Sequence, residues 1–359
     1  MQVRRFGGLV LLAAMLGLSG CSNVAYVAQA VRGHLDLLQR SRPVEDWLAD
    51  PATSPALHAR LELAQRLRAF AVTELKLPDN RSYKRYAELD RKAVVWNVVA
   101  APELSLKLQT WCWPVMGCVG YRGYFSREGA DALAAELRAD GREVWVYGVP
   151  AYSTLGWSEW LGGDPLLSTF IGWSEGELAR LVFHELAHQV AYAQDDTPFN
   201  ESFATAVERL GVRRWLDTQA DAAARAEYER FDARRRAFRA LVGETREALR
   251  TLYASDADEA TKRARKAELM AAMRARHAAL KAGEWAGYAG YDAWFDNANN
   301  AALGVQAAYD EWVPAFERLF EAEGADFKRF YAEVARLAAL PKAERRAALA
   351  AVAATGVEE

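Results

Sequence analysis

The residues of this chain that could do chemistry together lie in one short stretch, His184-Glu185-Leu-Ala-His188. Two His four residues apart on a helix share one face, so both imidazoles can bind one metal ion. Glu185 follows the first His, where it can address a water on that metal. Since the chain has only five His in 359 residues, this spacing predicts a zinc site with Glu185 as general base for hydrolysis. The alternative is a pair of surface His on an amphipathic helix.

A catalytic zinc site needs a third protein ligand and leaves a fourth position for water. No third His follows closely, but turn residues starting at Asp195 precede Asn200 and Glu201. We expect Asn200 to be the N-cap of the next helix, with Glu201 in its first turn. An antiparallel arrangement would direct Glu201 toward His188, which makes it the predicted third ligand. Glu208 is the alternative ligand, or an acid that orients a ligand His; Glu201 could also simply cap the helix.

These side chains require a helix in an apolar setting. Ser174 and Glu177 have capping-box spacing, which predicts a helix with Ser174 as N-cap. Leu178, Leu181 and Leu186 supply an apolar stripe. Polar side chains in the middle of such a helix are costly without partners, and a metal would provide them. The remaining His residues, His34, His58 and His277, are expected to be bystanders, with His277 solvated on a charged helix.

The whole chain predicts an α+β fold that is predominantly helical, with a small β-sheet packed beside the zinc-binding helix. Hydrophobic spacing gives helices before and after a β-rich stretch around residues 93–149. We expect one metallopeptidase domain over residues 21–359, with five parts: N-terminal helices 21–91, a mixed α/β segment 92–172, zinc-site helices 173–216, a charged helical arm 217–283, and C-terminal helices 284–359. Residues 283–300 are expected to be irregular.

Charge and the N-terminus indicate where the protein works. The formal net charge is −3, and the basic residues of the arm are interleaved with acids, so no nucleic-acid binding is expected. Residues 1–20 have the charge and length of a signal peptide and end before Cys21 in a pattern typical of bacterial lipoproteins. Cys21 is therefore the predicted lipidation site, which would anchor the protein in the outer membrane, facing the periplasm. A plain secretory signal is the alternative. Cleavage removes two arginines and changes the formal charge from −3 to −5.

The other two cysteines, Cys112 and Cys118, are separated by a short segment containing Pro114 and Gly117. Because export leads to an oxidising compartment, we predict a disulfide between them. Two reduced buried thiols are the alternative. A zinc site is less favoured because no His lies near in sequence.

An ordered set of motifs resembles a known family. The motifs are Cys118-Val-Gly-Tyr-Arg-Gly-Tyr-Phe125, Ala151–Trp157 with Asp164–Thr169, Phe183–Gln189, Asn200-Glu-Ser-Phe-Ala204, and Asn299–Leu303 with Tyr309 and Val313–Phe316. Together they look like a bacterial family of gluzincin-like zinc peptidases, lipoproteins described as putative aminopeptidases, over roughly residues 110–335. The resemblance implies zinc on His184, His188 and Glu201, with Glu185 as base. It also makes Tyr309 and Asn300 the preferred substrate contacts, and Tyr309 the preferred oxyanion donor over Tyr192, Tyr288 and Tyr291. Ser158–Gly163 departs from the pattern by lengthening a loop.

The predicted activity is zinc-dependent peptide hydrolysis, most simply as an aminopeptidase acting on a peptide substrate. An exopeptidase must bind a free α-amine, for which Glu208, Asp164 and Asp296 are the candidates. An edge strand within Ala151–Thr169 would suit an endopeptidase equally well. Two other classes stay open: a non-catalytic envelope lipoprotein with a structural metal, and a zinc amidase acting on cell-wall peptides.

Overall fold

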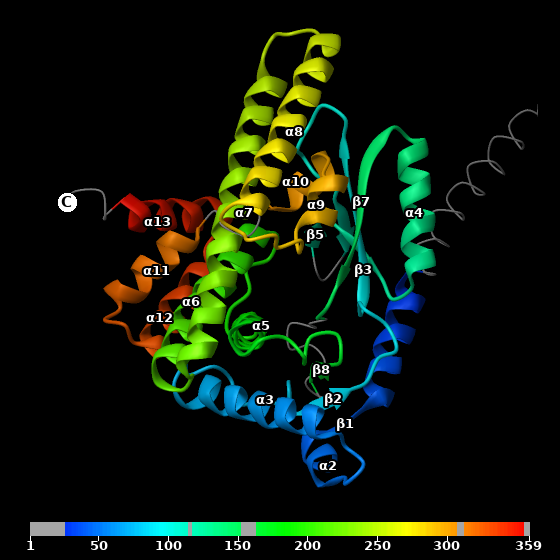
Figure 1. The fold of residues 1–359 in the computed structure, drawn as a ribbon. Coiled ribbons are helices and arrows are strands. Elements are labelled where there is room, and N and C mark those ends of the chain that lie inside the picture. The colour runs from blue at the N-terminus through cyan, green and yellow to red at the C-terminus, as the bar shows by residue number, and fades with distance from the viewer. Residues whose placement is uncertain (1–25, 114–116, 152–162, 307–311, 355–359) are drawn as a thin grey trace, which may run out of the picture.

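The computed structural model describes residues 26–113, 117–151, 163–306 and 312–354 (Figure 1). Residues 26–40 are helical. The further helices are α2 (Val44–Ala49), α3 (Pro55–Thr73), α4 (Arg127–Ala139), α5 (Glu175–Ala187), α6 (Thr197–Thr218), α7 (Ala222–Ala254), α8 (Glu259–Ala282), α9 (Asp292–Asn297), α10 (Asn300–Val305), α11 (Val313–Ala322), α12 (Phe327–Ala338) and α13 (Lys342–Ala354). The strands are β1 (Ser41–Pro43), β2 (Arg85–Ala87), β3 (Val95–Pro102), β4 (Trp111–Trp113), β5 (Gly117–Val119), β6 (Arg122–Tyr124), β7 (Arg142–Val149) and β8 (Leu166–Leu167). This is the predicted α+β fold, predominantly helical with small sheets.

The largest sheet is antiparallel, with β3 between β6 and β7. Successive residues of a strand face opposite sides, and β3 is buried on both. Val98 and Ala100 pack with α4, whereas Val99 and Ala101 pack against Ala301 of α10. Figure 1 shows α4 on the outer side of this sheet and α10 on the inner side. The mixed pattern of buried residues along β3 follows from this double cover.

Helix α5 lies at the centre of the main hydrophobic core. Its apolar side chains pack against α3 and α6 and share one core with side chains of α11, α12 and the small sheet β1-β2-β8. Leu178, Val182, Phe183 and Leu186 are all fully buried. Figure 1 shows α5 end-on in the middle of the molecule, between α6 and the sheets. Because α5 is enclosed on nearly all sides, its position is fixed by packing, as a helix that carries a site requires.

Helices α7 and α8 form the charged arm predicted for residues 217–283. They pack against each other, and Figure 1 shows their tips extending beyond the rest of the molecule. Their inward side chains, among them Phe238, Leu241 and Met273, share a second core with α9. His277 belongs to this core too: it is buried and its ring stacks on Phe295 at a centroid distance of 4.0 Å. The prediction of a solvated His277 was therefore wrong, because α9 covers that face of α8.

Other predicted boundaries hold only in part. The helical pattern expected up to residue 91 ends with α3 at Thr73, and β2 follows. The segment 283–300, expected to be irregular, contains the short helix α9. The disulfide predicted between Cys112 and Cys118 is present and joins the paired strands β4 and β5. In the described part of the chain, no helix has both the length and the apolar composition needed to cross a membrane.

Candidate metal centre

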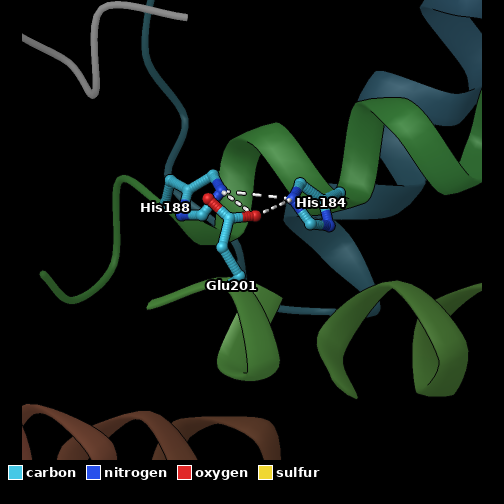
Figure 2. A group of neighbouring side chains, drawn as sticks. All are labelled: His184, His188 and Glu201. Carbon is cyan, nitrogen blue, oxygen red and sulfur yellow. Dashed lines mark hydrogen bonds and ion pairs between the residues drawn. The ribbon is translucent and has the colours of Figure 1, made fainter. Parts of the chain in front are cut away.

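Three side chains converge at the end of α5. The Nε2 atoms of His184 and His188 lie 3.2 Å apart, and Glu201 Oε2 lies 3.4 Å from His184 Nε2 and 3.8 Å from His188 Nε2. Figure 2 shows the two rings on α5 and the carboxylate rising toward them from α6. No other group of three or more His, Cys, Asp and Glu side chains with ligand atoms this close, within 4.8 Å of one another, occurs among the described residues. The sequence-predicted ligands thus come together in space.

The contacts between α5 and α6 run in opposite directions along the two helices. His184, early in the motif, contacts Glu208, and His188 contacts Glu201, which comes earlier in α6. This is the antiparallel arrangement expected from a tight connection. Helix α5 ends at Ala187, and His188 is its C-cap with helical backbone angles, so the i,i+4 spacing of the two rings is preserved.

The start of α6 differs from the prediction. Helix α6 begins at Thr197 with Asp196 as N-cap, so Asn200 is not the cap and Glu201 lies in the second turn. Instead, Asn200 is buried and its amide bridges back to Ala193, accepting from its N–H at 2.8 Å and donating to its carbonyl at 2.9 Å. These bonds close the connection between the helices and set where Glu201 points. Helix-dipole capping by Glu201 is excluded by its distance from the helix start.

The connection is also held from outside. The Asp196 carboxylate is fully buried and accepts hydrogen bonds from Arg345 at 2.8 Å and Arg346 at 3.0 Å, both on α13. Asp195 has a left-handed backbone (φ 57°), and its side chain accepts a hydrogen bond from the Cys118 N–H at 2.9 Å. The C-terminal helix and the disulfide hairpin therefore both brace the turn between the ligand-bearing helices.

Glu208 lies behind the ligands rather than among them. Its carboxylate lies 2.9 Å from His184 Nδ1 and 3.0 Å from Arg180 Nη1, and the residue is 3% exposed. A carboxylate on Nδ1 holds that nitrogen protonated, which leaves Nε2 to face the other ligands. Of the alternatives for Glu208, the structure favours the one in which it orients His184. A substrate contact, the role also predicted for it, does not fit this burial and these partners.

The network continues to the beginning of α5. Arg180 pairs with Glu177 at 3.3 Å, and Glu177 also pairs with Arg235 of α7. Ser174 is the N-cap of α5, as predicted, but its side chain makes no capping hydrogen bond. Glu177 is engaged by the two arginines, so the expected capping box is replaced by a chain of ion pairs leading to Glu208 and His184.

Burial and neighbouring charges split the pKa values of the two imidazoles. Burial alone would lower the pKa of His184, but hydrogen bonds to Glu201 and Glu208 raise it to about 10. Burial lowers the pKa of His188 to about 4, against the opposing charge of Glu201. The pKa values of Glu201 and Glu208 are both lowered, because the His rings and, for Glu208, Arg180 outweigh burial. At neutral pH, the His184 ring therefore carries a proton on each nitrogen and is positively charged between two carboxylates.

The donor set and its spacing fit a zinc ion. Zinc prefers imidazole nitrogen and carboxylate oxygen at about 2.0–2.1 Å, and two tetrahedral ligands at that range lie about 3.3 Å apart. The three observed separations of 3.2, 3.4 and 3.8 Å are close to this value. Three protein ligands leave one position for water or substrate, the open arrangement of catalytic sites.

Glu185 lies half-buried on α5 between the two His. Burial raises the pKa of Tyr83, and the charge of Glu185 raises it further. Tyr83 was not among the residues selected from the sequence. Three further phenols, those of Tyr121, Tyr147 and Tyr192, have pKa values raised by partial desolvation and then by neighbouring acids: Glu201 contributes in each case, and Asp195 contributes more than Glu201 for Tyr192. Of these, only Tyr192 was a candidate from the sequence. The others come from β7 and from the residue before β6, which lie far from α6 in the chain.

The remaining predicted residues lie elsewhere or outside the described residues. Asn300 is fully buried, and its amide donates to the carbonyls of Pro102 and Glu103 and accepts from the Tyr253 hydroxyl. The structure thus does not bring Asn300 to the cluster, because it joins α10 to the end of β3. Tyr309 and Cys21 lie outside the described residues.

The other candidate tyrosines and acids are also accounted for. Tyr288 and Tyr291 pack in the aromatic core beneath the arm. Asp296 is exposed on α9. Asp164 is buried, and its backbone pairs with Ser82 and Tyr83 near α5. Of the three predicted amine binders, Asp164 is the one that contacts Tyr83, whose pKa is raised in part by the charge of Glu185.

Comparison with known proteins adds the family. Residues 25–349 match the model of the family described as "Putative aminopeptidase". Comparisons with curated proteins and with solved structures give no match. The family match extends well beyond the motifs at residues 110–335 and includes the N-terminal helices and the first part of α13. Because it spans most of the chain, the protein is a member of this aminopeptidase family.

Proposed function

We propose that this protein is a zinc-dependent aminopeptidase. The observation that carries the proposal is the convergence of Glu201 of α6 with His184 and His188 of α5, the helix that also bears Glu185, with ligand atoms within 4.8 Å of one another. Family membership supports a peptidase. A structural zinc site would not need Glu185, since structural sites are closed by their four ligands.

The chain's own residues divide the work of hydrolysis. When bound, zinc would lower the pKa of a coordinated water toward 7 and polarise the scissile carbonyl. Glu185 takes the proton from the attacking water and delivers it to the leaving amine. Glu208 keeps the Nδ1 proton on His184, so that Nε2 can serve as a ligand. Tyr309 remains our predicted donor to the oxyanion, and Tyr192 is the alternative, supported by the contribution of Glu201 to its raised pKa.

Matched peptides with free and acetylated N-termini test the proposal. The purified protein should cleave the free-amine peptide in a zinc-dependent way, lose activity to a chelator, and leave the acetylated peptide intact. Glu185→Gln should retain zinc and keep only a small residual hydrolysis, with the exposed Glu247→Gln of α7 as the matched control. Full activity in Glu185→Gln would falsify the catalytic assignment. Equal cleavage of both peptides would leave a zinc endopeptidase in place of an aminopeptidase.

We also propose that Cys21 carries a lipid anchor in the bacterial envelope, in the outer membrane and facing the periplasm. The signal-like residues 1–20 support this, as does the disulfide between Cys112 and Cys118, which suits an oxidising compartment. Labelled palmitate should be incorporated by the wild type and not by Cys21→Ser. A soluble periplasmic protein with an unmodified Cys21 would contradict the anchor and leave the peptidase proposal unaffected.

A further inference from the structure

Tyr83 combines two unusual features. Its backbone has φ 63°, a left-handed conformation that an aromatic residue seldom adopts and that is energetically unfavourable. Its side chain is 3% exposed, and its hydroxyl has no hydrogen-bond partner among the described residues. A buried hydroxyl without a partner is itself destabilising. Two such features in one residue persist only where the surrounding structure enforces them.

The loop that carries Tyr83 is held from several sides. Arg68 of α3 is buried and donates to the carbonyls of Pro78 at 2.9 Å, Asn80 at 3.2 Å and Ser82 at 3.1 Å. The Tyr83 N–H donates to the Asp164 carbonyl at 2.7 Å. These bonds fix the backbone of residues 78–83, so the conformation of Tyr83 is imposed by its neighbours rather than chosen by its own preference.

Gly163 completes this constraint. A Cβ at residue 163 would lie 2.5 Å from the Ser82 backbone nitrogen, and Gly163 itself has φ 74°. The Asp164 N–H donates to Ser82 Oγ at 3.1 Å. The two chain segments therefore approach at backbone distance, which only glycine permits at this position.

The same loop rests on the end of α5. Gln189, which directly follows His188, donates to Ser82 Oγ at 3.2 Å and accepts a hydrogen bond from the Asn80 side-chain amide. Burial raises the pKa of the Tyr83 phenol well above its ordinary value, and Glu185 is the acidic group that adds most to this rise. At neutral pH, Tyr83 is therefore a protonated donor held beside the helix that bears Glu185.

We propose that Tyr83 is a positioning residue for Glu185, its hydroxyl donating a hydrogen bond to that carboxylate and holding it in the orientation that accepts the proton of the attacking water. This role rests on the proposed peptidase function. It explains why a strained backbone and an unpartnered hydroxyl are retained: the partner is engaged when substrate binds and Glu185 turns to its working position. With 3% exposure, Tyr83 is too enclosed to contact substrate directly.

Tyr83→Phe tests the role, with Tyr331→Phe as the matched control. Tyr331 is also buried, but its hydroxyl donates to the Leu75 carbonyl at 2.9 Å. We expect Tyr83→Phe to lower kcat by about 10- to 100-fold with KM and zinc content unchanged, and to leave Tm unchanged or raised, because no formed hydrogen bond is lost. Tyr331→Phe should show the reverse pattern, a lower Tm with unchanged kcat.

A double variant separates a direct effect on Glu185 from a general one. In Glu185→Gln, whose residual turnover no longer uses the carboxylate, adding Tyr83→Phe should have no further effect on kcat. Unchanged kcat in Tyr83→Phe, the same fold-loss in the Glu185→Gln background, or a Tm drop as large as that of Tyr331→Phe would each overturn the positioning role. A wild type without zinc-dependent turnover overturns the proposed function and this role with it, whereas a fully active Tyr83→Phe overturns this role alone.

Discussion

The helix pair α5–α6 and the helix pair α7–α8 both carry ion pairs between Arg and Glu. These ion pairs differ in their solvent exposure and in the residues that they contact. Glu208 of α6 has a side chain 3% exposed and bridges Arg180 and His184. Glu247 of α7 has a side chain 62% exposed and pairs locally with Arg250, three residues along the same helix. Burial strengthens and orders a charge pair, while solvent screens an exposed one.

The difference in burial indicates different roles for the ion pairs of the two regions. The buried pairs run in sequence from Arg235 and Glu177 through Arg180 to Glu208, and end on the ring of His184, a predicted metal ligand. Desolvating charges in this way is expensive and gives little net stability. Because this network has a high desolvation cost and ends on His184, its role is better explained by positioning the His184 ring than by stabilising the fold. The Glu247–Arg250 pair of the arm, in contrast, is exposed and joins two residues of the same helix.

Removal of a ligand should give the largest contrast between the two regions. Glu201→Gln takes the carboxylate from the cluster, so we expect loss of bound zinc and a fall in kcat/KM of about 10³-fold or more. Zinc content by atomic absorption and turnover of a free-amine peptide measure both effects. The same substitution at Glu247 should change neither. A zinc-loaded, active Glu201→Gln would show that another residue completes the site.

Removal of the orienting carboxylate should give the next largest effect. Glu208→Gln keeps the shape but loses the charge that holds His184, and we expect zinc affinity to fall by about 10- to 100-fold. Because Arg180 is left without its buried partner, the free energy of unfolding should also fall, by about 3 kcal/mol. Competition with a chromogenic chelator and thermal unfolding measure the two quantities. If the free energy of unfolding falls but zinc affinity does not change, the ion-pair network around Glu208 has only a structural role.

The pH dependence of zinc binding sharpens the contrast further. The pKa of His184 is raised to about 10, so its ring is protonated at pH 7, whereas a ligand imidazole must be neutral. Zinc binding should therefore release one proton, and affinity should rise about tenfold per pH unit from pH 7 toward 9. Calorimetry in two buffers with different ionisation enthalpies counts the protons. Release of none would mean that His184 is already neutral in the zinc-free protein.

The sequence predicted the parts of the site that depend on local spacing. The rings of His184 and His188 share a helix face because of 3.6-residue periodicity, and a short connection was enough to bring Glu201 to them. Asn200 was assigned the wrong role because Asp196 is an equally good N-cap residue. Pro198, which suits the first turn of a helix, favours the earlier start that the structure has.

The parts that could not be predicted come from distant segments. Tyr83 lies about a hundred residues before Glu185 in the chain, and Arg345 lies 149 residues after Asp196. Their side-chain types are common, and nothing in their local sequence separates them from other tyrosines and arginines. They become important only when α3, α5 and α13 pack together. Contacts between segments so far apart in the chain cannot be read from the local spacing of residues.

The smallest expected effect is in the arm, and it is the test most able to break the comparison. Arg250→Ala removes the partner of Glu247, an exposed pair that solvent screens. We expect Tm to stay within about 2 °C of the wild type, and zinc affinity and kcat to be unchanged. Arg235→Ala is the informative counterpart, because this arginine lies on the same helix but reaches Glu177 of α5. If α7 as a whole affects the metal site, both variants should change zinc affinity alike. If the burial of an ion pair and its contact with α5 determine the effect, only Arg235→Ala should weaken zinc binding.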